Sequence, residues 1–178
     1  EINLNEDKDK LNISEGNIIF KDVNFIYKSN PENKVLRNIN ANFTGGKMTA
    51  LVGYSGSGKS TLLNMIPRIY APTDGIIHFD DQDISKFNLA SLRNQISIVD
   101  QNTTLFDDTV LNNIKYARPE ATNEEIYQAA EQSMCNEFIK NLENGYETMI
   151  GENGVKLSGG EKQRLSIARA FLKKSKII

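Results

Sequence analysis

The residues of this chain best suited to chemistry form one glycine-rich stretch that fits the pattern G-x-x-x-x-G-K-[ST]. Its residues are Gly53, Tyr54, Ser55, Gly56, Ser57, Gly58, Lys59, Ser60 and Thr61. The glycines let successive backbone N–H groups point into one concavity at a helix N-terminus, where a polyphosphate can bind. Lys59 is expected to reach the terminal phosphates, and the Ser60 hydroxyl to ligate a bridging Mg²⁺. A chance match is the alternative, but the strand and helix expected on either side favour a nucleotide site.

A second helix start that could face an anion lies near the C-terminal end of the chain, at residues 158–161. Ser158 with Glu161 three residues later has the pattern of a capping box, which is a purely structural explanation. The intervening Gly159 and Gly160 also leave backbone N–H groups and a hydroxyl open to an anion. The sequence therefore offers two helix ends suited to phosphate.

The residues around the glycine-rich stretch predict an α/β domain. Alternating and β-branched residues predict strands over 17–27, 35–43, 48–52, 75–79 and 96–99, with helices after the stretch and over 88–94. In the first strand, the alternation places Ile19, Lys21, Val23, Phe25 and Tyr27 on one face. The strand over 96–99 would deliver Gln101 to its end. Residues 1–16 carry a mixed charge run, so we expect a solvated linker that follows something upstream.

The second half of the chain predicts helices without strands between them. Asp108 or Thr109 caps a helix through Tyr116, and Thr122 with Glu125 forms a capping box. This box opens one long amphipathic helix that runs to Gly145. We therefore expect a helical subdomain, over about residues 103–174, inserted into the α/β core.

Composition excludes several classes of function. The 178 residues have a formal net charge of −2, so no global basic field recruits nucleic acid. The single cysteine, Cys135, cannot form an internal disulfide, and His78, the only histidine, suits a structural role. Asp80, Asp81 and Asp83 lack the spacing of a calcium loop. No apolar run approaches the roughly 20 residues of a membrane span, so we expect a soluble segment.

From Phe20 onward the sequence resembles the nucleotide-binding domain of ABC transporters. The glycine-rich stretch matches the family's Walker A motif, and residues 157–163 look like its signature motif. Gln101 resembles the Q-loop glutamine, and Tyr27 stands where the family has an aromatic ring that stacks on adenine. Residues 151–154 are similar to the X-loop of the exporter branch. Within that branch, residues 89–95 and 107–114 look closest to the bacterial lipid A flippases.

The resemblance implies a P-loop NTPase core with an N-terminal antiparallel β-subdomain and an inserted helical subdomain. It implies a head-to-tail homodimer in which one copy presents its signature motif to the ATP held by Lys59 of the other. The signature residues that would act in trans are Ser158, Gly159, Gly160 and Gln163. Gln101 would ligate Mg²⁺ beside Ser60 and act with Lys59 in catalysis. Residues 103–116 would receive a coupling helix from a transmembrane domain of the same polypeptide, which Glu152 would sense.

The function implied is that of an ATPase module at the cytoplasmic face of the bacterial inner membrane. It would couple MgATP binding and hydrolysis to export or flipping of lipid A or a related amphipathic substrate. The chain ends at Ile178, where the family begins the strand to the Walker B aspartate, the catalytic glutamate and the switch histidine. We therefore expect a C-terminally truncated domain over 17–178 that binds ATP without hydrolysing it. Glu161 also departs from the family, which most often has Gln there.

Two other functions are compatible with the glycine-rich stretch. A soluble ABC ATPase acting on nucleic acid or ribosomes keeps the fold, but the X-loop-like residues around Glu152 argue against it. A small P-loop kinase would need a lid and an acceptor pocket, and it gives the helix start at Ser158 no role.

Overall fold

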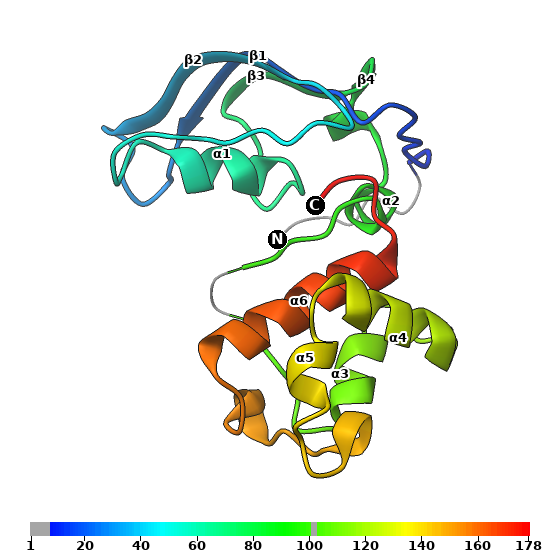
Figure 1. Cartoon of the computed structure of the whole chain (residues 1–178). Coiled ribbons are helices and arrows are strands. Elements are labelled where there is room, and N and C mark those ends of the chain that lie inside the picture. Colours follow the sequence, from blue (N-terminus) through cyan, green and yellow to red (C-terminus); the bar gives the residue numbers. More distant parts are fainter. Residues whose placement is uncertain (1–7, 101–102) are drawn as a thin grey trace. The chain divides into compact units, whose positions relative to one another are not determined.

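A computed structural model describes residues 8–100 and 103–178 of the chain (Figure 1). The chain divides into two compact units. The first comprises the residues up to Ile96 together with Ile177, and the second comprises Ser97–Lys176 with Ile178. The glycine-rich stretch belongs to the first unit and the signature-like residues belong to the second.

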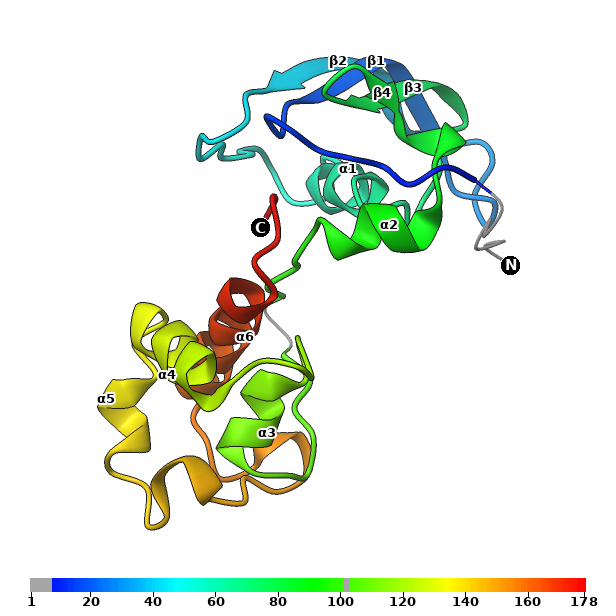
Figure 2. The ribbon, with the colours of Figure 1, turned by 90° about the vertical axis from the view of Figure 1, so that its right-hand side faces the viewer.

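The first unit is an antiparallel sheet with helices packed on it. Its strands lie in the order β2-β1-β3-β4, and Figures 1 and 2 show α1 and α2 on the same side of the sheet. The core between them contains Phe20, Met65 and Phe79, which are almost fully buried. The bounds are β1 (Ile18–Ile26), β2 (Lys34–Phe43), α1 (Lys59–Met65), β3 (Asp74–Phe79), β4 (Gln82–Asp83), the 3₁₀ turn η1 (Ile84–Lys86) and α2 (Leu89–Asn94).

The face of β1 that alternation predicted is wrong over its first half. Ile18 and Phe20 point into the core, whereas Ile19 is only half-buried and Lys21 is exposed. The cause is an irregularity at Asp22, whose φ of 51° lies in the left-handed region and where the pairing with both neighbouring strands shifts. Such a bulge moves the following residues to the opposite face, so that Val23 and Phe25 are buried together with Ile18 and Phe20.

The described part of the N-terminal segment is not a solvated linker. Leu11 and Ile13 are 3% and 2% exposed and join the core of the first unit. The Asp80 carboxylate accepts hydrogen bonds from the backbone N–H groups of residues 14–17 at 2.9–3.3 Å. The prediction was wrong because it rested on the charged residues that precede Leu11. Leu11 and Ile13 are two residues apart, and both side chains face the core. Residues 1–7 lie outside the described residues.

Two of the expected strands, over 48–52 and 96–99, are not formed as strands. Residues 48–52 have no strand partner among the residues that the structure describes, and Met48 and Val52 are 100% and 88% exposed. In the 96–99 segment the pairing is limited to a parallel bridge between Ile96 and Ile177. An apolar, β-branched run becomes a strand only where a neighbour satisfies its backbone hydrogen bonds.

The second unit is helical. It contains α3 (Val110–Lys115), α4 (Asn123–Gln132), α5 (Asn136–Ile139), the 3₁₀ turns η2 (Gly145–Glu147) and η3 (Glu152–Gly154), and α6 (Gly159–Lys173). Its core contains Ile126, Ile139 and Leu165.

The helix expected to run from Thr122 to Gly145 is interrupted. It divides into α4 and α5 at Ser133–Cys135, where Met134 has a φ of 60°. Met134 is 60% exposed, because this left-handed residue turns the chain out of the helix. Cys135 is buried as helix packing requires, and burial raises the pKa of its thiol to about 11.

Candidate nucleotide site

The glycine-rich stretch forms an exposed loop that leads into α1. Gly58 is the N-cap of α1 and has a φ of 88°, a left-handed conformation that glycine adopts without strain. A Cβ at this position would lie 2.8 Å from Leu36 Cδ2, so the loop also needs glycine for its close approach to β2. The residues of the loop from Gly53 to Ser57 are exposed and accessible to a ligand.

The Lys59 side chain turns back over its own loop. Its ammonium donates to the carbonyl oxygens of Gly53 at 2.9 Å and Tyr54 at 2.7 Å, and lies 3.3 Å from Ser57 Oγ. The Lys59 ammonium is therefore surrounded by oxygen atoms of the glycine-rich loop. An anionic phosphate would satisfy the same ammonium, with the Ser60 hydroxyl exposed in the first turn of α1 beside it.

Tyr27 lies next to the helix that follows this loop. Its hydroxyl is 2.8 Å from Oγ1 of Thr61, which is buried in the first turn of α1. The ring packs edge-on against Phe25 and Tyr70, with centroids 4.8 and 5.4 Å away. The sequence placed Tyr27 and Thr61 34 residues apart, and the fold brings them into contact.

The other expected metal ligand cannot be located in the same way. Gln101 lies outside the described residues. Among residues 8–100 and 103–178, no group of three His, Cys, Asp or Glu side chains could hold a metal ion. The Ser60 hydroxyl is a hard oxygen ligand, which suits Mg²⁺ when nucleotide phosphates supply the remaining ligands. The residues present therefore fit Mg²⁺ bound together with a nucleotide.

The signature-like residues begin α6 in the second unit. The Ser158 backbone N–H and hydroxyl each donate to Glu161 Oε2 at 2.7 Å, which completes the predicted capping box. Gly159, Gly160 and Gln163 are exposed on the first turns. A Cβ on either glycine would meet no atom within 4 Å, so the packing of the described residues does not require glycine there.

The sequence analysis missed a polar network that joins Arg169 of α6 to the buried Asn113. Arg169 donates to the backbone oxygen and Oδ1 of Asn113, both at 2.7 Å, and to the Thr104 carbonyl oxygen at 2.6 Å. Its guanidinium also lies 5.6 Å from the centre of the Phe106 ring, and burial lowers its pKa. The sequence did contain one indication of this network, because Arg169 lies between Ala168 and Ala170 among the apolar residues of α6. This network ties residues 104–113 to α6.

The segment expected to receive a membrane domain exposes aromatic rings. Phe106 and Tyr116 are 42% and 64% exposed, and their centroids are 4.4 Å apart. Thr109, one of the two expected caps, begins α3 by accepting from the Asn112 N–H. Glu152 is exposed at the start of η3. Phe106, Tyr116 and Glu152 are therefore all accessible to a partner.

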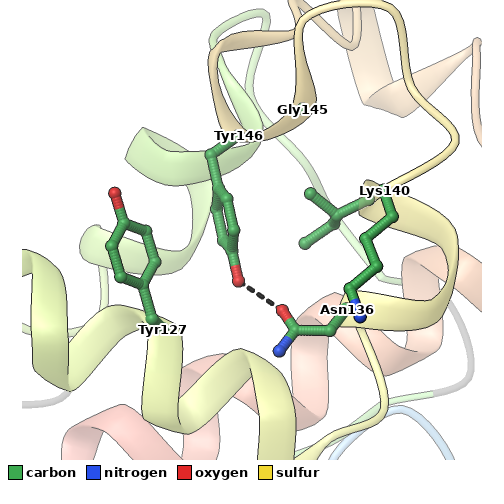
Figure 3. A pocket seen from close by; sticks show the side chains of 6 residues that line it. Tyr127, Asn136, Lys140, Gly145 and Tyr146 are labelled. Carbon is green, nitrogen blue, oxygen red and sulfur yellow. Dashed lines mark hydrogen bonds between the residues drawn. The ribbon is translucent and has the colours of Figure 1, made fainter.

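A separate hollow of about 360 Å³ lies in the second unit, between α4, α5 and η2 (Figure 3). The Tyr146 hydroxyl donates to Asn136 Oδ1 across it, and the Tyr127 and Tyr146 rings are 4.7 Å apart. None of the residues expected to bind a nucleotide lines this hollow.

Comparison with known proteins identifies the class. The sequence model described as ABC transporter matches residues 36–178, so the chain belongs to the ABC transporter family. The structure of a bacterial Atm1-family ABC exporter with ATP bound superposes with a TM-score of 0.92 at 38% identity. The match covers 98% of this chain and 30% of the exporter chain. The antiparallel sheet, phosphate loop and helices are thus those of a P-loop NTPase domain of the exporter branch.

Two curated relatives are also similar to most of this chain. The heavy metal tolerance protein of Schizosaccharomyces pombe is 49% identical over 168 residues, which cover 94% of this chain and 20% of that protein. A Staphylococcus aureus protein, named as a multidrug export ATP-binding/permease protein, is 49% identical over 168 residues, covering 94% of this chain and 29% of that protein. The chain therefore spans less than a third of these relatives' length. No helix within the described residues is long and apolar enough to cross a membrane.

Proposed function

We propose that this chain is the nucleotide-binding domain of an ABC exporter and binds MgATP at the Walker A loop. The observation that carries the proposal is the Lys59 ammonium, which is held by loop carbonyl oxygens beside the first turn of α1. Phosphate oxygens would replace those carbonyls, and the exposed loop N–H groups would bind the same phosphates. The Tyr27 ring, fixed next to Thr61, would stack on adenine.

The proposed metal and catalytic roles follow the family. Bound Mg²⁺ would neutralise phosphate charge, with Ser60 and Gln101 as its protein ligands. Ser158, Gly159, Gly160 and Gln163 of a second copy would contact the γ-phosphate, which explains why two exposed glycines begin α6 without a packing reason. In this proposal residues 1–16 lead from a transmembrane domain, and 17–178 form an ATP-binding domain with its helical subdomain at about 103–174.

The transport role is also part of the proposal. The full-length protein would hydrolyse ATP at the cytoplasmic face of the inner membrane and move a lipid or another amphipathic compound, with lipid A as one candidate. The named relatives concern heavy metal tolerance and multidrug export, so the proposed substrate class is kept broad. The exposed rings of Phe106 and Tyr116 would receive the membrane domain. Family membership leaves no support for the small P-loop kinase, and the exporter relatives disfavour the soluble ABC ATPase.

The test of nucleotide binding uses the chain itself and Lys59→Ala. We expect MgATP to raise the unfolding temperature of the unmodified chain, because a ligand that binds only the folded state stabilises it. Lys59→Ala should lose this shift, and Lys47→Ala, which removes an exposed lysine outside the loop, should keep it. Calorimetric titration with MgATP gives the affinities. An equal shift in the unmodified chain and in Lys59→Ala would refute the proposed site.

A further inference from the structure

Two helices of the second unit begin with a capping box, and the two boxes use their acidic residue differently. At α4, the Thr122 N–H donates to Glu125 at 3.2 Å, and the same carboxylate pairs with Arg118 at 2.6 Å and Lys174 at 2.9 Å. At α6, the Ser158 N–H and hydroxyl both donate to one oxygen of Glu161 at 2.7 Å. Among the described residues, no cation lies within ion-pair distance of Glu161. The two shortest contacts of Glu161 are therefore with Ser158.

This arrangement occupies the only proton that the Ser158 hydroxyl can donate. A hydroxyl has one O–H donor, and a hydrogen bond from it to a carboxylate is of the stronger, charge-assisted kind. Hydrogen bonds from Ser158 also hold the pKa of Glu161 below its usual value, so the carboxylate stays charged at neutral pH. A phosphate that approaches Ser158 thus meets an engaged hydroxyl and a negative charge beside it.

The approach to this helix end is otherwise open. Gly159 and Gly160 are exposed, and apart from the neighbouring backbone of α6 no atom of the described residues lies within 4 Å of the place where their Cβ atoms would be. Their free backbone N–H groups favour an anion, while the adjacent Glu161 opposes it. Whether this helix end favours a phosphate therefore depends mainly on the Glu161 side chain.

We propose that Glu161 is a positioning residue that competes with the γ-phosphate of MgATP for the Ser158 hydroxyl and so weakens ATP-driven closure of the dimer. The inference rests on the proposed function, because it needs Ser158 of one copy to contact ATP bound to the other. Glutamine at 161 keeps an oxygen acceptor for the Ser158 N–H and preserves the start of α6. It removes the charge and makes only a neutral hydrogen bond with the hydroxyl.

The experiment measures dimer closure rather than turnover. In the complete exporter, a fluorophore pair attached through Lys140→Cys reports the half-saturating concentration of MgATPγS from energy transfer between the copies. Lys140 is exposed and Cys135 is buried, so labelling is directed to the introduced thiol. Glu161→Gln should lower this concentration about fivefold, which corresponds to about 1 kcal/mol. Glu125→Gln is the matched control, since it removes the same charge from the other capping box, and it should leave the concentration unchanged.

A second background tests whether Glu161 acts through the hydroxyl. In Ser158→Ala, Glu161→Gln should lower the half-saturating concentration by clearly less than it does in the unmodified background, because there is no hydroxyl to release and only the loss of the charge remains. An unchanged concentration in Glu161→Gln alone, or an equal decrease in both backgrounds, would overturn the inference. Lys59→Ala distinguishes failure of the proposed nucleotide site from failure of the proposed role of Glu161. If closure of Lys59→Ala needs no more MgATPγS than closure of the unmodified exporter, the nucleotide site is wrong.

Discussion

At the scale of single residues, Tyr27 joins the sheet to the phosphate loop helix. It follows the last residue of β1, and its hydroxyl reaches Thr61, which is 6% exposed in the first turn of α1. The ring itself is held among other aromatic rings. The ring and the hydroxyl therefore have separable roles, the ring facing Phe25 and Tyr70 and the hydroxyl fixing α1.

Tyr27→Phe should destabilise the first unit by about 1 kcal/mol, because it removes one hydrogen bond and leaves the buried Thr61 hydroxyl without that partner. The MgATP affinity should change little, since the ring remains available for stacking. Urea unfolding and calorimetric titration measure the two effects. Tyr70→Phe is the control, because Tyr70 shares the ring contacts. A loss of affinity without a loss of stability would contradict the assigned role of the hydroxyl.

At the scale of elements, Glu125 connects the start of α4 to the end of α6. Its carboxylate completes the capping box of α4 and pairs with Arg118, which precedes α4, and with Lys174, the C-cap of α6. Hydrogen bonds from Arg118 and Lys174 lower the pKa of Glu125 to about 2. The charged form is thus favoured in the folded state.

The sign of the resulting pH dependence follows from this lowered pKa. The stabilisation is fully present above the ordinary value of 4.5 and is lost as the pH falls toward about 2. Glu125→Gln should therefore be less stable than the unmodified chain at pH 6, with the gap shrinking steadily below pH 4.5. Thermal unfolding between pH 2 and pH 6 measures this gap, with the exposed neighbour Glu124→Gln as control. A gap that stays constant across this range would exclude an ionic role for Glu125.

At the scale of the whole molecule, the first unit extends further toward the N-terminus than its sequence suggested. Residues 8–16 contribute Leu11 and Ile13 to the core, and Gln82 donates to the Asn12 carbonyl oxygen at 2.7 Å. Within the described residues, the folded domain therefore begins before the first strand and includes Leu11 and Ile13. If a membrane domain precedes this chain, as we propose, its connection joins the sheet through packed residues.

Ile13→Ala should cost the first unit about 3 kcal/mol, because truncating a fully buried aliphatic side chain loses its burial and leaves a cavity. Asn12→Ala is the matched control, as the Asn12 side chain is exposed and its hydrogen bond uses only the backbone. Urea unfolding of the chain measures both. If the two variants were equally stable, the result would contradict the packed N-terminal segment and support the predicted solvated linker.

The sequence by itself determined the features that depend on local chemistry. The glycine-rich loop before α1, the two capping boxes and the strands β1, β2 and β3 all formed near the predicted residues, because glycine conformation, side-chain caps and short-range periodicity act within a few residues. The same motifs carried the family resemblance that the comparisons confirmed.

Tertiary structure decided whatever depends on a distant partner. The bulge at Asp22 reversed the predicted face of β1, and residues 48–52 did not form a strand because no neighbour pairs with them among the described residues. Only the fold showed that Arg169 and Asn113 are hydrogen-bonded across 56 residues and that the Ser158 hydroxyl is engaged by Glu161. Pairing, burial and hydrogen-bond partners belong to two segments at once, so the pattern of either segment alone cannot specify them.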